Sequence, residues 1–334
     1  MEIVILGGSK LIGTALIEEL ARQHNGIRIH VVNRGITPPF INYSKLKNCK
    51  VIKHIADRTS PLDFKETLEK ITFKNKIDAV IDTSCYMPDE LTPAIRAFSN
   101  KIKHYILIST CAVYGKLKYV PANEDHPLDI SAENSMYGRE KIKCEHEITD
   151  ANKHKCFNTT ILRPSYIYGP NDYTRRLFYF IDRIYNDIPI LAPGEQTDFL
   201  FNAIYITDLA KQICMALLNE KFYGGVFNLS SSDSINFSDF LKLIGCAMNK
   251  EIKLMWIPKN DYKKITGELH FPYYISNAAY DCAKFRALCG EENFPFTPYY
   301  EGISQTIKWH REKKELPSGK NYNNELSYAD NQLN

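Results

Sequence analysis

Residues 3–13 read Ile3-Val4-Ile5-Leu6-Gly7-Gly8-Ser9-Lys10-Leu11-Ile12-Gly13. The first four form a continuous apolar run, which is typical of a buried strand, and the glycines that follow indicate a tight turn. From Leu11 to Arg22, apolar residues recur at helical spacing. The stretch therefore predicts a strand, a glycine turn and a helix in direct succession.

The same alternation of strand and helix continues along the first half of the chain. Five further apolar runs predict strands at Ile27–Val32, Lys50–Ile55, Asp78–Asp82, His104–Ser109 and Thr159–Arg163. Helical stretches lie near Phe64–Lys70 and Thr92–Phe98, and a long helix is expected after Asn134. Such alternation implies right-handed crossovers and a parallel sheet with helices on both faces. We therefore expect an α/β protein with a doubly wound parallel sheet.

The composition is that of a globular protein that can bury a sizeable core. Of 334 residues, 44% are hydrophobic, 12% aromatic and 24% charged, which excludes a disordered or fibrous chain. The net charge is +3 and no dense basic run occurs, which disfavours a dedicated nucleic-acid binder. No apolar stretch approaches the roughly 20 residues that cross a bilayer, and no signal peptide is visible, so a cytoplasmic protein is expected.

Neither disulfides nor a metal site are expected. Nine cysteines are scattered without a CxxC pair, which favours reduced thiols. Cys144, His146, His154 and Cys156 are residue types that bind zinc, but their spacing matches no familiar zinc pattern.

The glycine turn is the first candidate binding site. A dinucleotide pyrophosphate needs small residues for close backbone approach and free N–H groups from a helix N-terminus. The first strand–helix unit of an α/β chain is where such a turn occurs; the alternative is a plain tight turn. The candidate cofactor residues here are Gly7, Ser9, Lys10, Leu11, Ile12 and Gly13.

The end of the second strand bears on the choice of cofactor. An acidic residue there would bind the ribose 2′-hydroxyl of NAD, but this chain has Asn33-Arg34. Arg34, together with Lys10, could neutralise a 2′-phosphate, so NAD(P) with a preference for NADP is predicted. In the alternative interpretation Asn33 alone contacts the ribose and both cations are solvated.

A proton-transfer set follows the fifth strand. Thr110 stands at the strand end, and Tyr137 and Lys141 lie four apart on one face of the next helix. A free phenol, with a pKa of about 10, is a poor base near neutral pH, but an adjacent ammonium would stabilise its phenolate. Thr110 could then hold the substrate oxygen whose proton Tyr137 moves, which suits hydride transfer.

From residue 1 to about 310, the sequence resembles the extended short-chain dehydrogenase/reductase superfamily, in its NAD-dependent epimerase/dehydratase branch. The resemblance rests on the glycine turn, Asp57-Arg58, Ser109-Thr110 before Val113-Tyr114-Gly115, Tyr137 with Lys141, Leu162-Arg163-Pro164, Tyr168-Gly169-Pro170, Ile206-Thr207-Asp208-Leu209-Ala210, Phe227-Asn228-Leu229 and the stretch from Pro295 to Trp309.

This resemblance implies a Rossmann-type domain with a nicotinamide cofactor and a smaller C-terminal lobe over a sugar-type substrate. It places Asp57-Arg58 by the adenine, Thr83 and Ser84 along the cofactor, and the segment from Pro164 to Tyr166 by the nicotinamide. It also implies a homodimer formed through the helices near Thr92 and Tyr137.

Departures from the family pattern reduce the number of reactions that the resemblance allows. Lys10 replaces the usual middle glycine of the turn. Sugar-nucleotide 4,6-dehydratases carry an Asp-Glu pair after the Thr, and related decarboxylases carry a Glu, whereas this chain has Cys111 and Ala112. Dehydration and decarboxylation are therefore disfavoured.

Beyond Pro170 the alternation becomes irregular, which predicts a smaller lobe. Short strand-like pieces lie around Phe199–Ile206, Val226–Leu229 and Leu254–Ile257, and helices are expected near Leu209–Leu218 and Phe237–Met248. We expect residues 1–170 to be mainly the NAD(P)-binding domain, 171–310 mainly the substrate lobe with some segments returning to the sheet, and 311–334 a polar tail whose last 15 or so residues are poorly ordered. The family's nucleotide-binding Arg is absent from the stretch Phe199-Leu200-Phe201-Asn202; Arg175 or Arg176 could replace it, or be solvated. The substrate-contact candidates are Tyr86, Thr110, Arg175, Arg176, Phe199 and Asn202.

Two functions follow from these observations. The first is an NAD(P)-dependent epimerase or reductase acting on a hydroxyl or keto carbon of a sugar or sugar nucleotide, with Thr110, Tyr137 and Lys141 as catalytic residues. The alternative is a non-catalytic member of the same fold that binds cofactor or RNA.

Overall fold

A seven-stranded sheet organises the computed structural model, which describes residues 1–195, 198–268 and 270–333. The strand order is β11-β6-β5-β4-β1-β2-β3, and every neighbouring pair is parallel. The strands are β1 (Glu2–Leu6), β2 (Ile27–Asn33), β3 (Cys49–Ile55), β4 (Ala79–Asp82), β5 (His104–Ile108), β6 (Asn158–Pro164) and β11 (Val226–Leu229). Because the chain starts in the middle of the sheet and builds outward both ways, the expected doubly wound α/β fold is confirmed.

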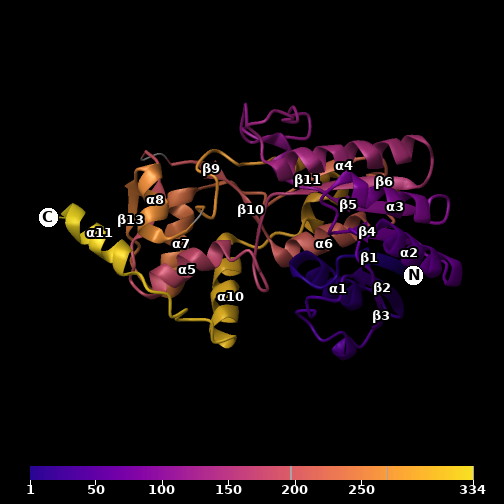
Figure 1. Ribbon diagram of the computed structural model, residues 1–334, viewed down its shortest axis with the longest axis horizontal. Coiled ribbons are helices and arrows are strands. Elements are labelled where there is room, and N and C mark those ends of the chain that lie inside the picture. Colours follow the sequence, from indigo (N-terminus) through magenta and orange to yellow (C-terminus); the bar gives the residue numbers. More distant parts are fainter. Residues whose placement is uncertain (196–197, 269, 334) are drawn as a thin grey trace.

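Helices cover both faces of this sheet (Figure 1). They are α1 (Leu11–Gln23), α2 (Pro61–Lys74), α3 (Pro88–Phe98), α4 (Met136–Lys153) and α6 (Ile206–Ala216). Alternate residues of β1 point to opposite faces: Ile3 and Ile5 join the core beneath α1 and α6, while Val4 and Leu6 join the core beneath α2, α3 and α4. The continuous apolar runs of the sequence reflect this burial on two faces.

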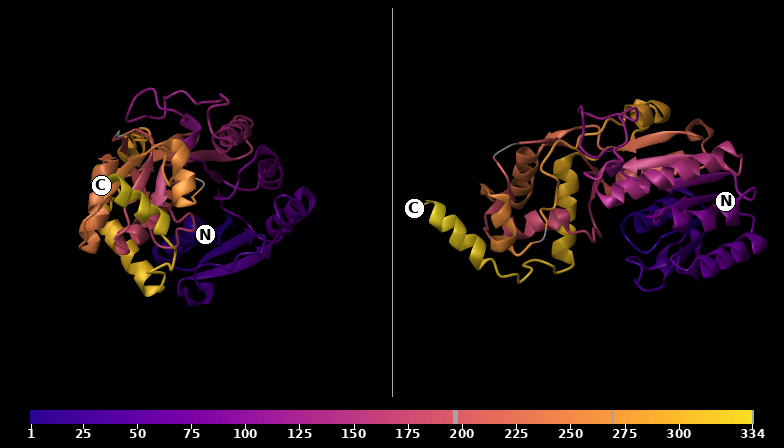
Figure 2. Two further views of the ribbon diagram at one scale, coloured as in Figure 1. Left: turned by 60° about the vertical axis from the view of Figure 1, so that its left-hand side comes forward. Right: turned by 45° about the horizontal axis from the view of Figure 1, so that its top comes forward.

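A second lobe extends from the sheet, and the two views of Figure 2 show it beside the carboxyl ends of the strands. Its elements are α5 (Arg176–Tyr185), β8 (Ile190–Pro193), α7 (Phe237–Met248), β13 (Leu254–Ile257), α8 (Lys259–Thr266) and α10 (Tyr299–Glu312). Short pairs connect it to the sheet half: β7 (Tyr166–Tyr168) with β10 (Ala203–Tyr205), and β9 (Leu200–Phe201) with β12 (Ile235–Asn236).

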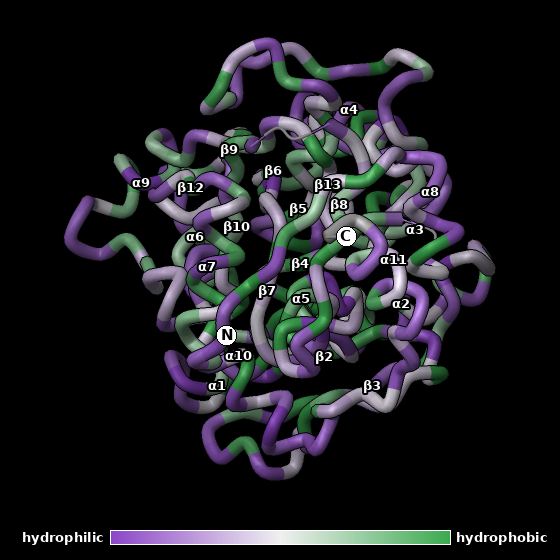
Figure 3. Tube along the Cα trace, turned by 90° about the vertical axis from the view of Figure 1, so that its left-hand side faces the viewer, coloured by the Kyte–Doolittle hydropathy of each residue, from purple (hydrophilic) through white to green (hydrophobic). Residues whose placement is uncertain are grey.

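The chain passes between the two halves more than once. After residue 170 it returns to add α6, which packs on α1, and β11, which pairs with β6. Helix α9 (Ala283–Cys289) packs on β11. One apolar core is continuous from β1 to the aromatic centre of the second lobe at Phe180 and Phe237. Figure 3 shows apolar segments gathered along the inner strands and polar segments in most outer loops.

The C-terminal segment is ordered, so the expectation of a poorly ordered end is wrong for most of its length. Residues Asn323–Leu333 form helix α11, which packs on α8. Tyr322 and Glu325 are buried, and the Glu325 carboxylate lies 2.8 Å from the buried Arg183 guanidinium. A largely polar sequence therefore docks through an ion pair and a hydrogen-bonded Tyr322, together with apolar contacts of Tyr328 and the buried Ala329.

Candidate functional site

A cavity of about 820 Å³ lies at the carboxyl ends of the parallel strands. It extends from the glycine turn past the ends of β2, β4 and β5 to the N-terminal end of α4, and the second lobe closes its far side. Open α/β sheets bind ligands at this edge. The volume is in the range of cavities that hold whole cofactors or substrates.

The glycine turn has the geometry that a pyrophosphate needs. A Cβ at Gly13 would lie 2.2 Å from the Gly7 carbonyl oxygen, so only glycine lets α1 approach the turn this closely. Gly7 has φ +93°, and a Cβ there would collide with Thr83 and Ser84. Helix α1 begins at Leu11 without a side-chain cap, which leaves backbone N–H groups directed at the cavity. These features fit the phosphates of a dinucleotide.

The end of β2 is held by Asn33. Its amide donates to Ser9 Oγ at 2.8 Å and accepts from the Gly35 N–H at 2.9 Å. Arg34 is exposed and lines the same end of the cavity as Asp57. Hydrogen bonds from Thr59, with a smaller contribution from Arg34, lower the pKa of Asp57. The Asp57 carboxylate is thus ionised at neutral pH.

Arg58 is engaged within the protein. Its guanidinium forms two hydrogen bonds to Asp82, of 2.8 and 2.9 Å, and also donates to Ser84 Oγ and the Glu90 carbonyl. Asp82 is fully buried, and despite desolvation its pKa is lowered by Arg58 and by a hydrogen bond from Tyr105. Arg58 therefore lines the cavity mainly as the residue that fixes the loop after β4.

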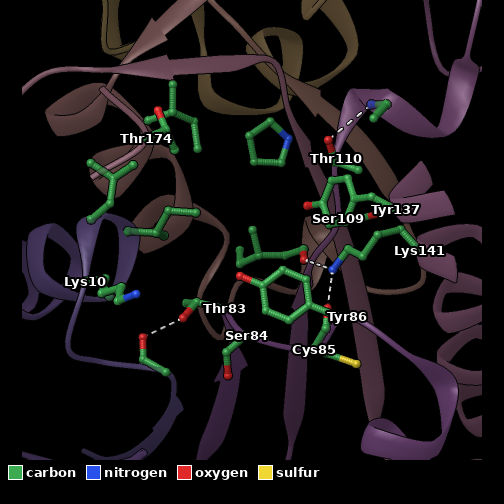
Figure 4. Close-up of a pocket in the computed structure, with 18 of the residues that line it drawn as sticks. Lys10, Thr83, Ser84, Cys85, Tyr86, Ser109, Thr110, Tyr137, Lys141 and Thr174 are labelled. Atoms are coloured by element: carbon green, nitrogen blue, oxygen red, sulfur yellow. Dashed lines mark hydrogen bonds between the residues drawn. The ribbon is translucent and has the colours of Figure 1, made fainter. Parts of the chain in front are cut away.

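Helix α4 carries the predicted proton-transfer residues into the cavity. Ser135 caps the helix by accepting from the Gly138 N–H at 3.0 Å. A Cβ at Gly138 would lie 2.5 Å from the Ala112 carbonyl, so glycine allows α4 to rest on the short 3₁₀ helix Cys111–Tyr114. Figure 4 shows Tyr137, Lys141, Thr110 and Ser109 gathered at one side of the cavity.

Lys141 is buried and fixed by backbone carbonyls. Its ammonium donates to Cys85 O at 2.8 Å and to Ile108 O at 2.6 Å. An ammonium has three N–H groups, so one remains for a ligand or for Tyr137. Tyr137 itself is 42% exposed, and its ring centroid lies 6.0 Å from that of Tyr86.

Thr110 and Ser109 have different environments. Thr110 Oγ1 accepts from the Ala112 N–H at 3.1 Å, which leaves its own proton free to donate into the cavity. Ser109 Oγ donates to the buried Glu145 carboxylate at 2.5 Å. Ser109 is therefore committed to the interior, and Thr110 is the hydroxyl available to a substrate.

The residues after Thr110 offer no further proton carrier. Cys111 is buried, and its thiol donates to the Arg163 carbonyl at 3.1 Å. Desolvation raises the pKa of this thiol, so it stays neutral. Ala112 has no titratable group. The second acid and base that an elimination requires are absent from these two positions.

The predicted substrate residues are only partly brought together. Tyr86, Tyr166 and Arg176 line the cavity, with the Arg176 guanidinium 5.9 Å from the Tyr166 ring centroid. The Tyr166 hydroxyl accepts from the Tyr274 N–H at 3.2 Å. All the predicted cofactor residues also line it, namely Gly7, Ser9, Lys10, Leu11, Ile12, Gly13, Asn33, Arg34, Asp57, Arg58, Thr83, Ser84, Tyr137, Lys141, Pro164 and Tyr166.

Three predicted substrate residues lie elsewhere. Arg175 stacks on Phe178 and pairs with Glu315 at 3.1 Å, away from the cavity. Phe199 is buried in the aromatic core of the second lobe. Asn202 is buried and bonded to the backbone of Tyr280, which ties two segments of that lobe together. Each of these three side chains is already engaged by other residues of the protein and is therefore not available to a substrate in the cavity.

Several lining residues were not singled out from the sequence. Tyr173, Tyr274 and Tyr280 face the cavity from loops that have no periodic pattern. Glu145 does not line the cavity but holds Ser109 and Arg163, and it follows Tyr137 and Lys141 at spacings of eight and four residues. That spacing places it on the same helix face, so it could have been found.

No group of three or more His, Cys, Asp or Glu side chains in residues 1–195, 198–268 and 270–333 is placed to hold a metal ion. No helix in that part of the chain is long and apolar enough to cross a membrane.

Residues 3–230 match the model of the NAD dependent epimerase/dehydratase family. This match covers well over half of the chain, and the protein belongs to that family.

Among curated relatives, one is the chloroplast stem-loop binding protein of 41 kDa b of Arabidopsis thaliana, 28% identical over 72% of this chain. Another is the dTDP-D-glucose 4,6-dehydratase of Dictyostelium discoideum, 26% identical over 73% of this chain. The chain spans about three fifths of the length of these two relatives, 61% of each.

Solved structures agree on the fold. The dTDP-glucose 4,6-dehydratase of Bacillus anthracis, solved with NAD, superposes with a TM-score of 0.76 at 16% identity, over 95% of this chain and 98% of its own. The UDP-glucose 4-epimerase of Thermotoga maritima, solved with UDP-glucose, gives 0.73 at 17% identity, over 94% and 100%.

Proposed function

We propose that the protein is an NAD(P)-dependent epimerase or reductase acting on a hydroxyl or keto carbon of a sugar or sugar nucleotide. One observation supports this most. A single cavity joins a glycine turn shaped for a dinucleotide to a Thr, a Tyr and a buried Lys at the strand ends. The family supplies the NAD-dependent chemistry, and the sugar nucleotides named for related proteins supply the substrate class.

The side chains would act as follows. Thr110 donates to the substrate oxygen and fixes its position. Tyr137 takes the proton of the substrate hydroxyl during oxidation and returns it during reduction. Lys141, held by two carbonyls, stabilises the phenolate through its positive charge and has one N–H left to bind the cofactor ribose. A nicotinamide dinucleotide, when bound, supplies the two-electron chemistry at the substrate carbon.

Cys111 and Ala112 support epimerisation or simple reduction over dehydration and decarboxylation. A neutral, buried thiol and a methyl group cannot supply the extra acid and base that loss of water requires. An epimerase would retain its cofactor and use it twice, and a reductase would release it. Mass spectrometry of the purified, denatured protein separates these two outcomes, since only the first leaves an oxidised dinucleotide with the protein.

The test of the catalytic assignment is Tyr137→Phe. We expect the turnover rate to fall about 10²- to 10⁴-fold, because a proton carrier is lost, while dinucleotide affinity stays within about twofold. Turnover is measured on a panel of sugar nucleotides, by chromatography of the sugar products for an epimerase and by the absorbance of the reduced cofactor for a reductase. Tyr300→Phe, an exposed tyrosine on α10 outside the cavity, is the matched control. Full turnover in Tyr137→Phe would disprove the assignment.

We also propose NADP as the preferred cofactor, on the basis of Arg34 beside Asn33. Lys10, the other cation considered, lies over the Tyr173 ring, whereas Arg34 adjoins Asn33 at the end of β2 and lines the cavity there; Arg34 is therefore the residue proposed to meet a 2′-phosphate. Arg34→Gln should weaken NADPH binding about tenfold, the effect of one lost charge-assisted contact, and leave NADH binding unchanged. Fluorescence titration measures both, with Arg96→Gln on the exposed side of α3 as control. Equal losses of NADPH and NADH affinity in Arg34→Gln would contradict the proposed preference for NADP.

A second candidate is a non-catalytic RNA-binding protein, which the stem-loop binding named for the Arabidopsis relative favours. The near-balanced net charge disfavours RNA binding, and the complete set of Thr110, Tyr137 and Lys141 favours an enzyme. Cofactor binding without turnover on the panel, together with salt-dependent binding of a stem-loop RNA, would reverse this preference. The homodimer through the helices near Thr92 and Tyr137 stays a prediction.

A further inference from the structure

Lys10 has an unusual partner for a residue of a phosphate-binding turn. Its ammonium lies 4.6 Å from the centroid of the Tyr173 ring. No ion pair involves Lys10 among the residues that the structure describes. A cation over the face of a tyrosine is attracted by the ring quadrupole. The turn is therefore attached to a residue that comes more than 160 positions later in the chain.

Tyr173 also lies near the other wall of the cavity. It lines the cavity together with Tyr86, in the loop after β4, and burial raises the pKa of Tyr86 with a further contribution from the neighbouring Tyr173. Tyr86 in turn lies against Tyr137, with ring centroids 6.0 Å apart. The three residues Lys10, Tyr173 and Tyr86 form a contact that crosses the cavity from the glycine turn to the proton-transfer residue, and we call it the clasp.

The backbone of Tyr173 is held firmly enough for this contact to be specific. Asp172 Oδ1 accepts from the Thr174 N–H at 2.9 Å and from Thr174 Oγ1 at 2.6 Å, and Asp172 is buried. Helix α5 starts directly after this turn. The Tyr173 side chain is 48% exposed, so its position depends on Lys10 and Tyr86 rather than on burial in a core.

We propose that Tyr173 closes the cavity over the bound dinucleotide, with Lys10 and Tyr86 as the two points that hold it. This inference rests on the proposed function, since it concerns the same cavity. The clasp spans the region between the pyrophosphate turn and Tyr137, through which the nicotinamide half of a dinucleotide must pass. A pyrophosphate beside Lys10 would lie on the side of the ammonium opposite the Tyr173 ring. The ammonium would then attract the pyrophosphate and the ring at the same time. Release of the cofactor then requires the clasp to open.

The experiment measures the dissociation rate of NADH and of NADPH from the full-length protein, by stopped-flow fluorescence with excess unlabelled NAD(P)⁺ as competitor. Tyr173→Ala removes both contacts, and we expect it to raise the dissociation rate about tenfold. Tyr173→Phe keeps the ring for Lys10 and removes only the hydroxyl, so its effect should be smaller. Tyr300→Ala, a similarly exposed tyrosine outside the cavity, should leave the rate unchanged.

A double-mutant cycle separates the clasp from a direct phosphate contact. Lys10→Met should raise the dissociation rate in both backgrounds, because the phosphate contact is lost in each, but by a clearly larger factor in the wild-type background, where the contact with the Tyr173 ring is lost as well. A rate in Tyr173→Ala within twofold of wild type would overturn the inference, and so would equal effects of Lys10→Met in both backgrounds. If Tyr173→Ala does not fold, the dinucleotide dissociation rate of Tyr173→Phe is used in its place. If the wild-type protein binds neither dinucleotide, the proposed function itself has failed.

Discussion

His104 shows how a single buried residue makes the stability of this protein depend on pH. Its Nδ1 accepts from the Leu218 N–H at 3.1 Å, so the proton is assigned to Nε2, which lies 2.8 Å from Thr160 Oγ1. Thr160 then donates to the Phe222 carbonyl. Burial lowers the pKa of His104 to about 3. The folded protein needs the neutral ring, since a second ring proton would face the Leu218 N–H.

The sign of the effect follows from this lowered pKa. Above a pH of about 6.5 the ring is neutral in both the folded and unfolded states, and its contribution to stability is complete. Below that value only the unfolded state takes up the proton, so stability falls as the pH drops toward 3. We expect a loss of about 2 kcal/mol in the free energy of unfolding between pH 7 and pH 5 from this group.

Urea denaturation at these two pH values tests the prediction. His104→Asn should have a lower free energy of unfolding than the wild type at pH 7. Between pH 7 and pH 5, however, its free energy of unfolding should fall by less than that of the wild type. His146→Asn, on the exposed side of α4, should keep the wild-type pH dependence. An unchanged pH dependence in His104→Asn would assign the acid sensitivity to other groups.

At the scale of elements, α4 is fixed to the sheet by a buried ion pair. Arg163 on β6 donates to Glu145 on α4 through Nε at 3.0 Å and Nη2 at 2.6 Å. Ser109 donates to the same carboxylate, and Arg163 also reaches the Tyr114 hydroxyl at 2.8 Å. Glu145 is on the face of α4 that carries Tyr137 and Lys141. The ion pair therefore positions both residues relative to the ends of β5 and β6.

Glu145→Ala should destabilise the protein by about 3 to 5 kcal/mol, because it leaves the Arg163 guanidinium buried without its partner. Asp150→Ala removes an exposed ion pair of the same helix and should cost less than about 1 kcal/mol. Chemical denaturation measures both. A loss in Glu145→Ala as small as that in Asp150→Ala would show that the interior rearranges to satisfy Arg163.

The elements also differ in how well the sequence predicted them. The expected helix Phe237–Met248 and the strands Val226–Leu229 and Leu254–Ile257 have the observed bounds. The strand-like stretch from Phe199 to Ile206 instead forms two short strands, and α6 begins at Ile206. Where a helix or strand is buried along its whole length, the run of hydrophobic residues marks its bounds. Short strands that are defined by pairing with a distant segment have no such signal in the local sequence.

At the scale of the whole molecule, α11 docks on the second lobe through polar groups. The Arg183 guanidinium contacts Glu325, and the Tyr322 hydroxyl donates to Asp182. Both Arg183 and Glu325 are 2% exposed. Desolvation raises the pKa of Glu325, although Arg183 opposes this. The tail is held by a pairing that composition could not reveal.

Glu325→Ala should lower the free energy of unfolding by about 3 kcal/mol, since it leaves the buried Arg183 with only the more distant Glu268 carboxylate, at 4.0 Å. Glu312→Ala, which removes an exposed pair at the end of α10, should have almost no effect. Calorimetry and limited proteolysis of the C-terminal segment test this. Equal stability of the two variants would mean that the tail is not docked in solution.

The sequence by itself determined the strand–turn–helix order, the parallel sheet and the placement of Tyr137 and Lys141 four residues apart on one helix. These follow from local periodicity and from the rule that parallel strand ends share one edge. Only the tertiary structure decided which polar groups are free. Arg58, Ser109 and Arg175 have the chemistry of site residues, but each is engaged by a partner from a distant segment. The same holds for Tyr173, whose ring lies beside Lys10 of the glycine turn more than 160 residues earlier in the chain. Contacts of this kind leave no periodic pattern in the sequence.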